Sequence, residues 1–164
     1  MSVTIRRASA ADVDTVLLLI QELAEYEREP EAVSATREDL LRDGFAEVPL
    51  FTVDLAVELA PSGGEEVLGM ALYFANYSTW EGRRGIYLEE LYVRPPARRR
   101  GIGKALVAHL AAELKRTGGA RLDLSVLDWN QPARDFYAAL GFNDQATWRS
   151  YRLTGEALAR QAGS

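Results

Sequence analysis

Cysteine is absent from the 164-residue chain, and histidine occurs only once. The absence of thiols excludes disulfides, thiolate nucleophiles and cysteine-based metal sites, and it agrees with a reducing compartment. The single histidine, His109, has no serine, cysteine or metal-ligand partner at a useful spacing. We therefore expect His109 to pack or to face solvent, and we expect no metal.

Long hydrophobic runs are also missing. No apolar stretch approaches the about 20 residues that span a bilayer, and the N-terminal MSVTIRRASA has no signal-peptide core. The formal net charge is -5, so no global field attracts nucleic acid or an anionic membrane surface. We expect a cytoplasmic protein with a single domain over 1–164, in which about 155–164 form a frayed tail.

Hydrophobic alternation and helical spacing indicate a mixed α/β fold. A helix must connect the strand at 86–93 with the strand at 121–127, so we expect these two strands to be parallel in a sheet whose first half is antiparallel. The predicted strands cover 3–7, 51–59, 67–76, 86–93, 121–127 and 147–153, and the predicted helices cover 13–24, 36–44, 103–115 and 130–140.

A basic, glycine-rich turn, RRRGIGK, occupies 98–104 at the start of a predicted helix. Backbone N–H groups at a helix N-terminus bind phosphate oxygens, because these groups lack intrahelical partners and the helix dipole favours an anion. Gly101 and Gly103 allow close approach of the main chain, and the arginines add charge-assisted contacts. The turn is therefore a candidate phosphate site.

Other interpretations of this turn can be compared with it. A P-loop requires glycine at position 98 and Ser or Thr at position 105, where the chain has Arg98 and Ala105. A dinucleotide fingerprint requires a third glycine where Leu106 stands. A nucleic-acid patch does not suit an acidic chain. A solvated basic turn remains open on the residues alone.

The surroundings of the turn favour a more specific interpretation. Arg98, Gly101 and Gly103 form R-x-x-G-x-G after a strand and a proline-rich turn, and LDWNQPARDFYAALGF follows at 127–142. Both elements resemble motifs of the GNAT family of acetyl-CoA-dependent N-acetyltransferases. The blocks GFAEVPLF, NYSTWEGRRGIYLEELYV, VLDWNQ and DFYAALGF are similar, in order and spacing, to the branch that holds diamine (spermidine/spermine) and thialysine Nε-acetyltransferases.

The resemblance extends from about residue 5 to residue 153 and implies the GNAT fold, a mostly antiparallel sheet with splayed parallel central strands flanked by helices. It also implies acetyl-CoA as co-substrate. Asn130 is a good helix N-cap, which alone would explain it. The implied coenzyme contacts are Leu91, Tyr92, Val93, Arg98, Arg99, Arg100, Gly101, Ile102, Gly103, Lys104, Asn130, Pro132 and Ala133.

Acetyl transfer to an amine requires loss of a proton, because an alkylammonium with a pKa of about 10.4 is only about one part in a thousand neutral at pH 7. Glu89 and Glu90 are adjacent on the strand at 86–93 and are expected to face opposite sides of the sheet. A solvated strand edge would also explain this pair, although apolar neighbours make an idle carboxylate costly there. The resemblance implies Glu89 as general base, acting through water, and Glu90 as a contact of the substrate amine.

Tyr137 lies on the same helical face as Phe136 and Leu140, so core packing alone would explain it. The resemblance implies instead that Tyr137 is the general acid that protonates the departing CoA sulfur. A phenol with a pKa of about 10 can donate a proton at neutral pH.

For the amine acceptor, the resemblance implies Tyr26 and Glu27, which periodicity alone describes as the polar end of a helix. Ser78, in NYSTWEG, stands where the diamine enzymes tend to carry aspartate. Loss of that carboxylate should weaken binding of a long polycation by about 1–3 kcal/mol. We therefore expect Ser78 to line the site of a short amine, such as the side chain of a thialysine-like amino acid.

Two alternatives stay open on the sequence. One is acetylation of a diamine or polyamine, and the other is a non-catalytic module that only binds acyl-CoA, against which Tyr137 and Glu89 argue because a binder needs neither. Without cysteine we expect direct transfer in a ternary complex. The resemblance also implies a homodimer, for which the aromatic segment Trp148–Leu153 is a candidate pairing strand, and we expect neither nucleic acid nor membrane as a partner.

Overall fold

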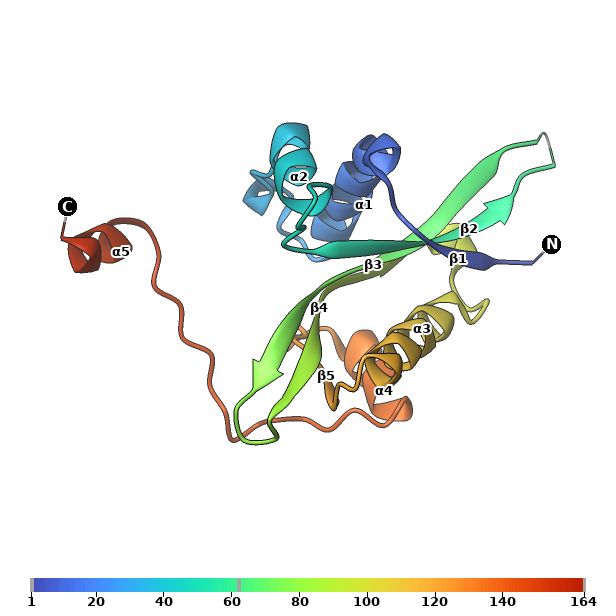
Figure 1. Cartoon of the computed structure of the whole chain (residues 1–164). Coiled ribbons are helices and arrows are strands. Elements are labelled where there is room, and N and C mark those ends of the chain that lie inside the picture. The colour runs from blue at the N-terminus through green and yellow to red at the C-terminus, as the bar shows by residue number, and fades with distance from the viewer. Residues whose placement is uncertain (1, 62, 164) are drawn as a thin grey trace. The chain divides into compact units, whose positions relative to one another are not determined.

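A computed structural model describes residues 2–61 and 63–163 (Figure 1). The chain divides into two compact units, Met1–Leu127 and Asp128–Ser164. The first unit contains β1 (Thr4–Arg7), α1 (Val13–Tyr26), α2 (Arg37–Gly44), β2 (Thr52–Leu59), β3 (Glu65–Ser78), β4 (Arg83–Val93), α3 (Ile102–Arg116) and β5 (Arg121–Leu124), with short 3-10 turns at Ala10–Asp12, Pro30–Ala32 and Pro95–Ala97.

The strands of the first unit form one sheet in the order β1-β2-β3-β4-β5. The first three pairings are antiparallel and the β4–β5 pairing is parallel. This confirms the mixed sheet predicted from the sequence, with α3 as the connection that makes β4 and β5 parallel. β5 is shorter than expected, because it ends at Leu124 rather than at residue 127.

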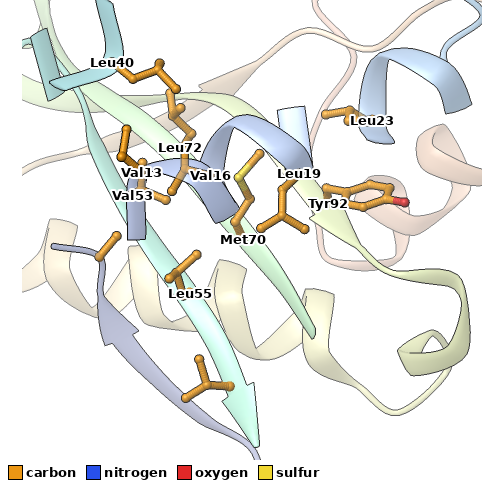
Figure 2. Close-up of a cluster of buried hydrophobic side chains, with 12 residues drawn as sticks. Val13, Val16, Leu19, Leu23, Leu40, Val53, Leu55, Met70, Leu72 and Tyr92 are labelled. Carbon is orange, nitrogen blue, oxygen red and sulfur yellow. The ribbon is translucent and has the colours of Figure 1, made fainter. Parts of the chain in front are cut away.

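Helices cover both faces of this sheet, with α1 and α2 on one face and α3 on the other (Figure 1). The apolar residues of α1 recur every three or four positions and bury one stripe of the helix. Figure 2 shows the cluster beneath α1 and α2, which contains Ala8, Val13, Val16, Leu19, Leu23, Leu40, Val53, Leu55, Val57, Met70, Leu72 and Tyr92. The opposite cluster packs Ile102, Leu106, Leu110 and Leu114 of α3 against Leu88 and other residues of the sheet.

A β-bulge in β4 changes which side of the sheet its residues face. Leu72 pairs with Glu90, but the next residue of β3, Tyr73, pairs with Leu88, so Glu89 has no opposite residue. An extra residue of this kind reverses the alternation of the strand. Leu88 accordingly belongs to the cluster under α3, whereas Tyr92 belongs to the cluster under α1.

A polar network lies between the sheet and α3. Asp54 is 1% exposed and accepts hydrogen bonds from Arg7 Nε at 2.8 Å and from Tyr73 Oη at 2.8 Å. His109 of α3 lies with its Nε2 3.4 Å from the same carboxylate. Burial and the Asp54 charge raise the pKa of Tyr73. The lone histidine therefore packs as expected, but against an acidic group that the sequence analysis did not identify.

Replacing Asp54 by alanine is expected to lower the free energy of unfolding by about 1–3 kcal/mol, because the Tyr73 hydroxyl then loses its buried acceptor. Urea denaturation followed by circular dichroism measures this change. Asp14→Ala is a matched control, since Asp14 also pairs with an arginine, Arg37 at 2.9 Å, but is 73% exposed. We expect the control to cost less than about 0.5 kcal/mol; equal losses for the two variants would contradict the role of the buried network.

The second unit contains α4 (Gln131–Ala139) and α5 (Gly155–Ala162). Asn130 caps α4, as predicted, because its side-chain oxygen accepts the N–H of Ala133 at 3.3 Å. The strand predicted at 147–153 is wrong: the described part of this unit contains no strand, and Trp148, Tyr151 and Leu153 are exposed. The segment expected to fray instead forms α5.

Among the residues that the structure describes, no helix combines the length and the apolar character that crossing a membrane requires.

Candidate functional site

The carboxylates that the sequence singles out gather where β4 passes the end of α1. The bulge places Glu90 on the side of the sheet that carries α1, where it is half-buried, while Glu89 is exposed. Glu27 is the C-cap of α1 and interacts electrostatically with Glu90. The fold therefore brings Glu27, Glu89 and Glu90 together from two separate elements.

Glu90 is the most strongly perturbed of these acids. Burial, followed by repulsion from Glu27 and then from Glu89, raises the pKa of Glu90 to about 7. Burial also raises the pKa of Glu27. A carboxyl group that titrates near neutral pH can both accept and release a proton under the conditions in which an enzyme works.

Beside these acids, Arg98 contacts two aromatic rings. Its guanidinium carbon lies 4.9 Å from the ring centroid of Tyr26 and 5.8 Å from that of Tyr92, distances typical of cation–π contacts. Its Nε donates a hydrogen bond to the carbonyl oxygen of Val93 at 2.9 Å. The side chain of Arg98, which is also a predicted coenzyme contact, therefore contacts both α1 and β4.

The turn that follows has the backbone of an anion site. Arg99 and Gly101 have positive φ values of 61° and 78°, and left-handed residues in a turn orient successive N–H groups toward one side. Gly101 caps α3 without a side-chain contact, and a Cβ built on it would meet no atom within 4 Å. Ile102, Gly103 and Lys104 begin α3, so their N–H groups lie in the helical turn that lacks intrahelical acceptors.

Of the three adjacent arginines in this turn, Arg98 and Arg100 contact other protein groups. Arg100 pairs with Glu58 of β2 at 2.7 Å, and this contact ties the turn to the sheet. Arg99 and Lys104 are exposed next to the open backbone of the turn. Both side chains can add positive charge for a phosphate bound at this backbone.

The end of β4 extends beyond its ladder with β5. The ladder between β4 and β5 stops at Leu88 and Leu124, while β4 continues to Val93 along β3. Leu91, Tyr92 and Val93 therefore have no ladder partner in β5, although the carbonyl oxygen of Val93 already accepts the hydrogen bond from Arg98. Such a gap between parallel strands lets an extended ligand hydrogen-bond to the main chain.

Ser78 has a local structural role. It is 4% exposed, and its hydroxyl accepts the backbone N–H of Glu81 at 3.2 Å in the turn between β3 and β4. Trp80 in the same turn is 88% exposed. The hydroxyl predicted to line the acceptor site is therefore occupied in holding this turn.

The remaining predicted site residues lie in the second unit. Tyr137 of α4 makes edge-to-face contacts with Phe136 and Phe142, at centroid distances of 5.1 and 5.3 Å. Asn130 is 5% exposed, and Pro132 and Ala133 form the first turn of α4 after it. Within this unit, the aromatic contacts set the position of the Tyr137 ring.

Comparison with known proteins gives this arrangement a family. The model of the acetyltransferase (GNAT) family matches residues 17–142. The chain belongs to the GNAT acetyltransferase family. This GNAT protein is 42% identical to the thialysine N-epsilon-acetyltransferase of Bos taurus, with 98% of each chain covered. It is 34% identical to the Homo sapiens spermidine/spermine N(1)-acetyltransferase-like protein 1, covering 96% of this chain and 23% of the relative.

Solved structures agree with this membership. An integron cassette protein from the mobile metagenome of V. cholerae superposes with a TM-score of 0.80 at 29% identity, covering 100% of this chain and 99% of that protein. The chain is therefore an N-acetyltransferase of the GNAT fold, and membership of the family implies acetyl-CoA as co-substrate and a small-molecule amine as acceptor. The open backbone of the Arg98–Lys104 turn fits the diphosphate of such a coenzyme.

Two contacts near the site cannot be predicted from the sequence. Arg94 pairs with Glu22 of α1 at 2.8 Å, and Arg98 stacks on Tyr26. No motif or spacing signals either contact, because the partners are about 70 residues apart in the chain and meet only through the fold.

Proposed function

We propose that the protein transfers the acetyl group of acetyl-CoA to the side-chain amine of a thialysine-like amino acid. The observation that carries this proposal is the acidic group of Glu27, Glu89 and Glu90 beside the open backbone of β4, which suits a compact cationic amine. The relatives support the same acceptor: thialysine N-epsilon-acetyltransferases of Bos taurus, Sus scrofa and Mus musculus are 39–42% identical over 98–99% of this chain.

In this proposal the coenzyme is held mainly by main-chain groups. The N–H groups that open α3 bind the diphosphate, with Arg99 and Lys104 adding charge, and Leu91–Val93 pair with the amides of the pantetheine arm. An N–H of the same strand segment polarises the acetyl carbonyl. Asn130, Pro132 and Ala133 supply further coenzyme contacts from the start of α4.

The chemistry then needs three proton transfers. The acceptor ammonium gives a proton to a glutamate, and the neutral nitrogen attacks the thioester carbon to form a tetrahedral intermediate. The C–S bond breaks, the thiolate takes the phenolic proton of Tyr137, and the nitrogen gives its second proton to the resulting phenolate. Transfer is direct, because the chain has no cysteine to carry the acetyl group.

Glu89 and Glu90 divide the remaining roles. The resemblance to the family assigns the base to Glu89, acting through water, and the amine contact to Glu90. The pKa of about 7 favours Glu90 as the group that takes the proton, since a base works best when its pKa is near the operating pH. We therefore propose Glu90 as the base and Glu89 as an ionic contact of the acceptor or of a bridging water.

Diamine acetylation is the second candidate, supported by the spermidine/spermine-type relative. A long polycation needs a carboxylate at its distal nitrogen, and the residue at the aspartate position of the diamine enzymes is Ser78, whose hydroxyl is buried in a turn. This difference favours the shorter acceptor.

A panel of amines is expected to rank thialysine above spermidine by about tenfold or more in kcat/KM, because the loss of one ionic contact costs the polyamine about that factor. Thiol release from acetyl-CoA measures the rates. A preference for spermidine would replace the thialysine assignment by the diamine assignment. Absence of turnover with every amine, together with heat of CoA binding in calorimetry, would leave only the acyl-CoA-binding alternative.

We also propose that the enzyme is a homodimer that needs no metal. Exposed Trp148, Tyr151 and Leu153 support an association surface in the second unit, because large apolar side chains gathered in one short segment are common at interfaces. The acetyl transfer described above uses only proton transfers and main-chain groups, so it calls for no metal ion.

A further inference from the structure

The Pro95–Ala97 turn, which leads into the Arg98–Lys104 turn proposed to bind the coenzyme, is attached to α1 at both of its ends. Arg94 precedes the Pro95–Ala97 turn and makes a bidentate contact with Glu22, through Nε at 3.1 and 3.2 Å and Nη2 at 2.8 Å. Arg98 follows the turn and stacks on Tyr26 at 4.9 Å. Glu22 and Tyr26 are four residues apart, so both contacts lie on one face of α1.

The two attachments differ in strength. Arg94 and Glu22 have side chains that are 27% and 26% exposed, and Arg94 Nη1 also donates to the carbonyl of Val67 at 3.0 Å. Arg98 is exposed, and its planar guanidinium makes one hydrogen bond and two ring contacts. The Arg94 contact is therefore the stronger of the two, and the Arg98 contact is the weaker one that a ligand can bias.

Both ends of the Arg98 contact belong to binding sites. Arg98 is the first residue of the loop whose backbone receives the diphosphate, and Tyr26 is followed at once by Glu27, which borders Glu90 in the acceptor site. A ligand that holds the loop in place favours the stacked arrangement, and a stacked Tyr26 holds the end of α1 where Glu27 faces Glu90. Two ligands that stabilise the same arrangement strengthen each other's binding.

We propose that Arg98 is a positioning residue that couples the coenzyme site to the acceptor site. Its guanidinium holds Tyr26 against the Arg98–Lys104 turn and does not itself bind the diphosphate. The proposal rests on the acceptor and coenzyme assignments of the proposed function. It adds that the amine binds more tightly to the CoA complex than to the free enzyme, and that this gain depends on the stacked arginine.

Calorimetry with CoA and the best amine of the panel, expected to be thialysine, measures the coupling directly, because CoA carries no acetyl group and no reaction occurs. We expect the wild-type protein to bind the amine about tenfold more tightly when CoA is saturating, a typical coupling between sites. Arg98→Met should reduce this gain to about twofold or less while CoA affinity without amine stays within about threefold.

Conservative variants separate stacking from charge. Arg98→Lys keeps the charge but has no planar group to lie between two rings, so it should behave like Arg98→Met. Tyr26→Phe keeps the ring and should retain the coupling, whereas Tyr26→Leu should lose it even though Arg98 is intact. Arg116→Met is the control, since Arg116 of α3 is 71% exposed and pairs with Glu113 on the same helix.

Several results would overturn the proposal. It fails if the wild-type protein shows no coupling, or if Arg98→Met weakens CoA binding tenfold or more and Arg98→Lys restores it, since Arg98 would then be a phosphate ligand. It also fails if Tyr26→Leu keeps the coupling. Absence of heat with CoA in the wild-type protein would instead remove the proposed function, so the two failures are distinguishable. Thermal unfolding of each variant identifies any that does not fold.

Discussion

Glu90→Gln is expected to lower kcat/KM by a factor of about 10² to 10⁴, the usual contribution of a positioned general base. Glutamine has nearly the same shape but cannot take the proton of the acceptor ammonium. Since the pKa of Glu90 is about 7, the wild-type kcat/KM should fall about tenfold per pH unit below pH 7 and level off above it. Initial rates between pH 5.5 and 8.5 measure this decrease of kcat/KM at low pH, which should be absent in Glu90→Gln.

Glu89→Gln is the matched control, because it removes an adjacent carboxylate that is exposed in the bulge. We expect a smaller loss of kcat/KM, mainly through a higher KM for the amine, and the decrease of kcat/KM at low pH should be retained. If instead Glu89→Gln removes this pH dependence and Glu90→Gln keeps it, the base is Glu89 and Glu90 is the amine contact.

The same pair of variants tests the linkage to stability. The pKa of Glu90 is raised in the folded protein above its ordinary value of 4.5, so the folded state binds more protons than the unfolded chain between about pH 4.5 and 7. The contribution of Glu90 to stability therefore declines as pH rises through this window. Glu90→Gln should remove that decline, which urea denaturation at several pH values detects.

Tyr137→Phe is expected to lower kcat by about 10²-fold while the dissociation constant of CoA changes little, because the ring keeps its contacts with Phe136 and Phe142 and only the proton donor is lost. Thiol release gives kcat and calorimetry gives the affinity. Tyr151→Phe is the control, since Tyr151 also lies in the second unit but is 93% exposed. Unchanged turnover in Tyr137→Phe would remove this residue from the mechanism.

Much of the fold could be predicted because its elements are encoded locally. The apolar stripe of α1, the alternation in β2 and β3, and the Asn130 cap each depend on residues close in sequence, and the structure confirms all three. The strand predicted at 147–153, which the structure does not contain, shows the limit of local prediction. Alternation predicts a strand, but a strand also needs a neighbour, and the described residues of its unit supply none.

Helix α5 could not be predicted for a different reason. The position of residues 155–164 predicts a tail, but GEALARQA is rich in good helix formers, and Gly163 ends the helix in a left-handed conformation with φ of 80°. Local propensity therefore outweighed the general expectation that chain ends fray.

The candidate site was predictable in part. The coenzyme turn and the acidic pair could be identified from the motif and its resemblance, but the partners of the arginines could not. Three adjacent arginines are equivalent in a sequence, yet Arg98 contacts aromatic rings and Arg100 contacts Glu58. These partners come from α1 and β2, so only the assembled fold distinguishes the side chains.

The bulge at Glu89 makes the number of residues in β4 as important as their identity. From Tyr92 backward, Glu90 shares a face with the tyrosine, and the extra residue then returns Leu88 to the opposite core. Deleting one residue here would either bury Glu90 under α3 or turn Leu88 away from its cluster. Chain length in this short stretch is thus under a constraint that neither a conservative substitution nor the family motif would reveal, and insertions or deletions should be tolerated in the β2–β3 turn but not here.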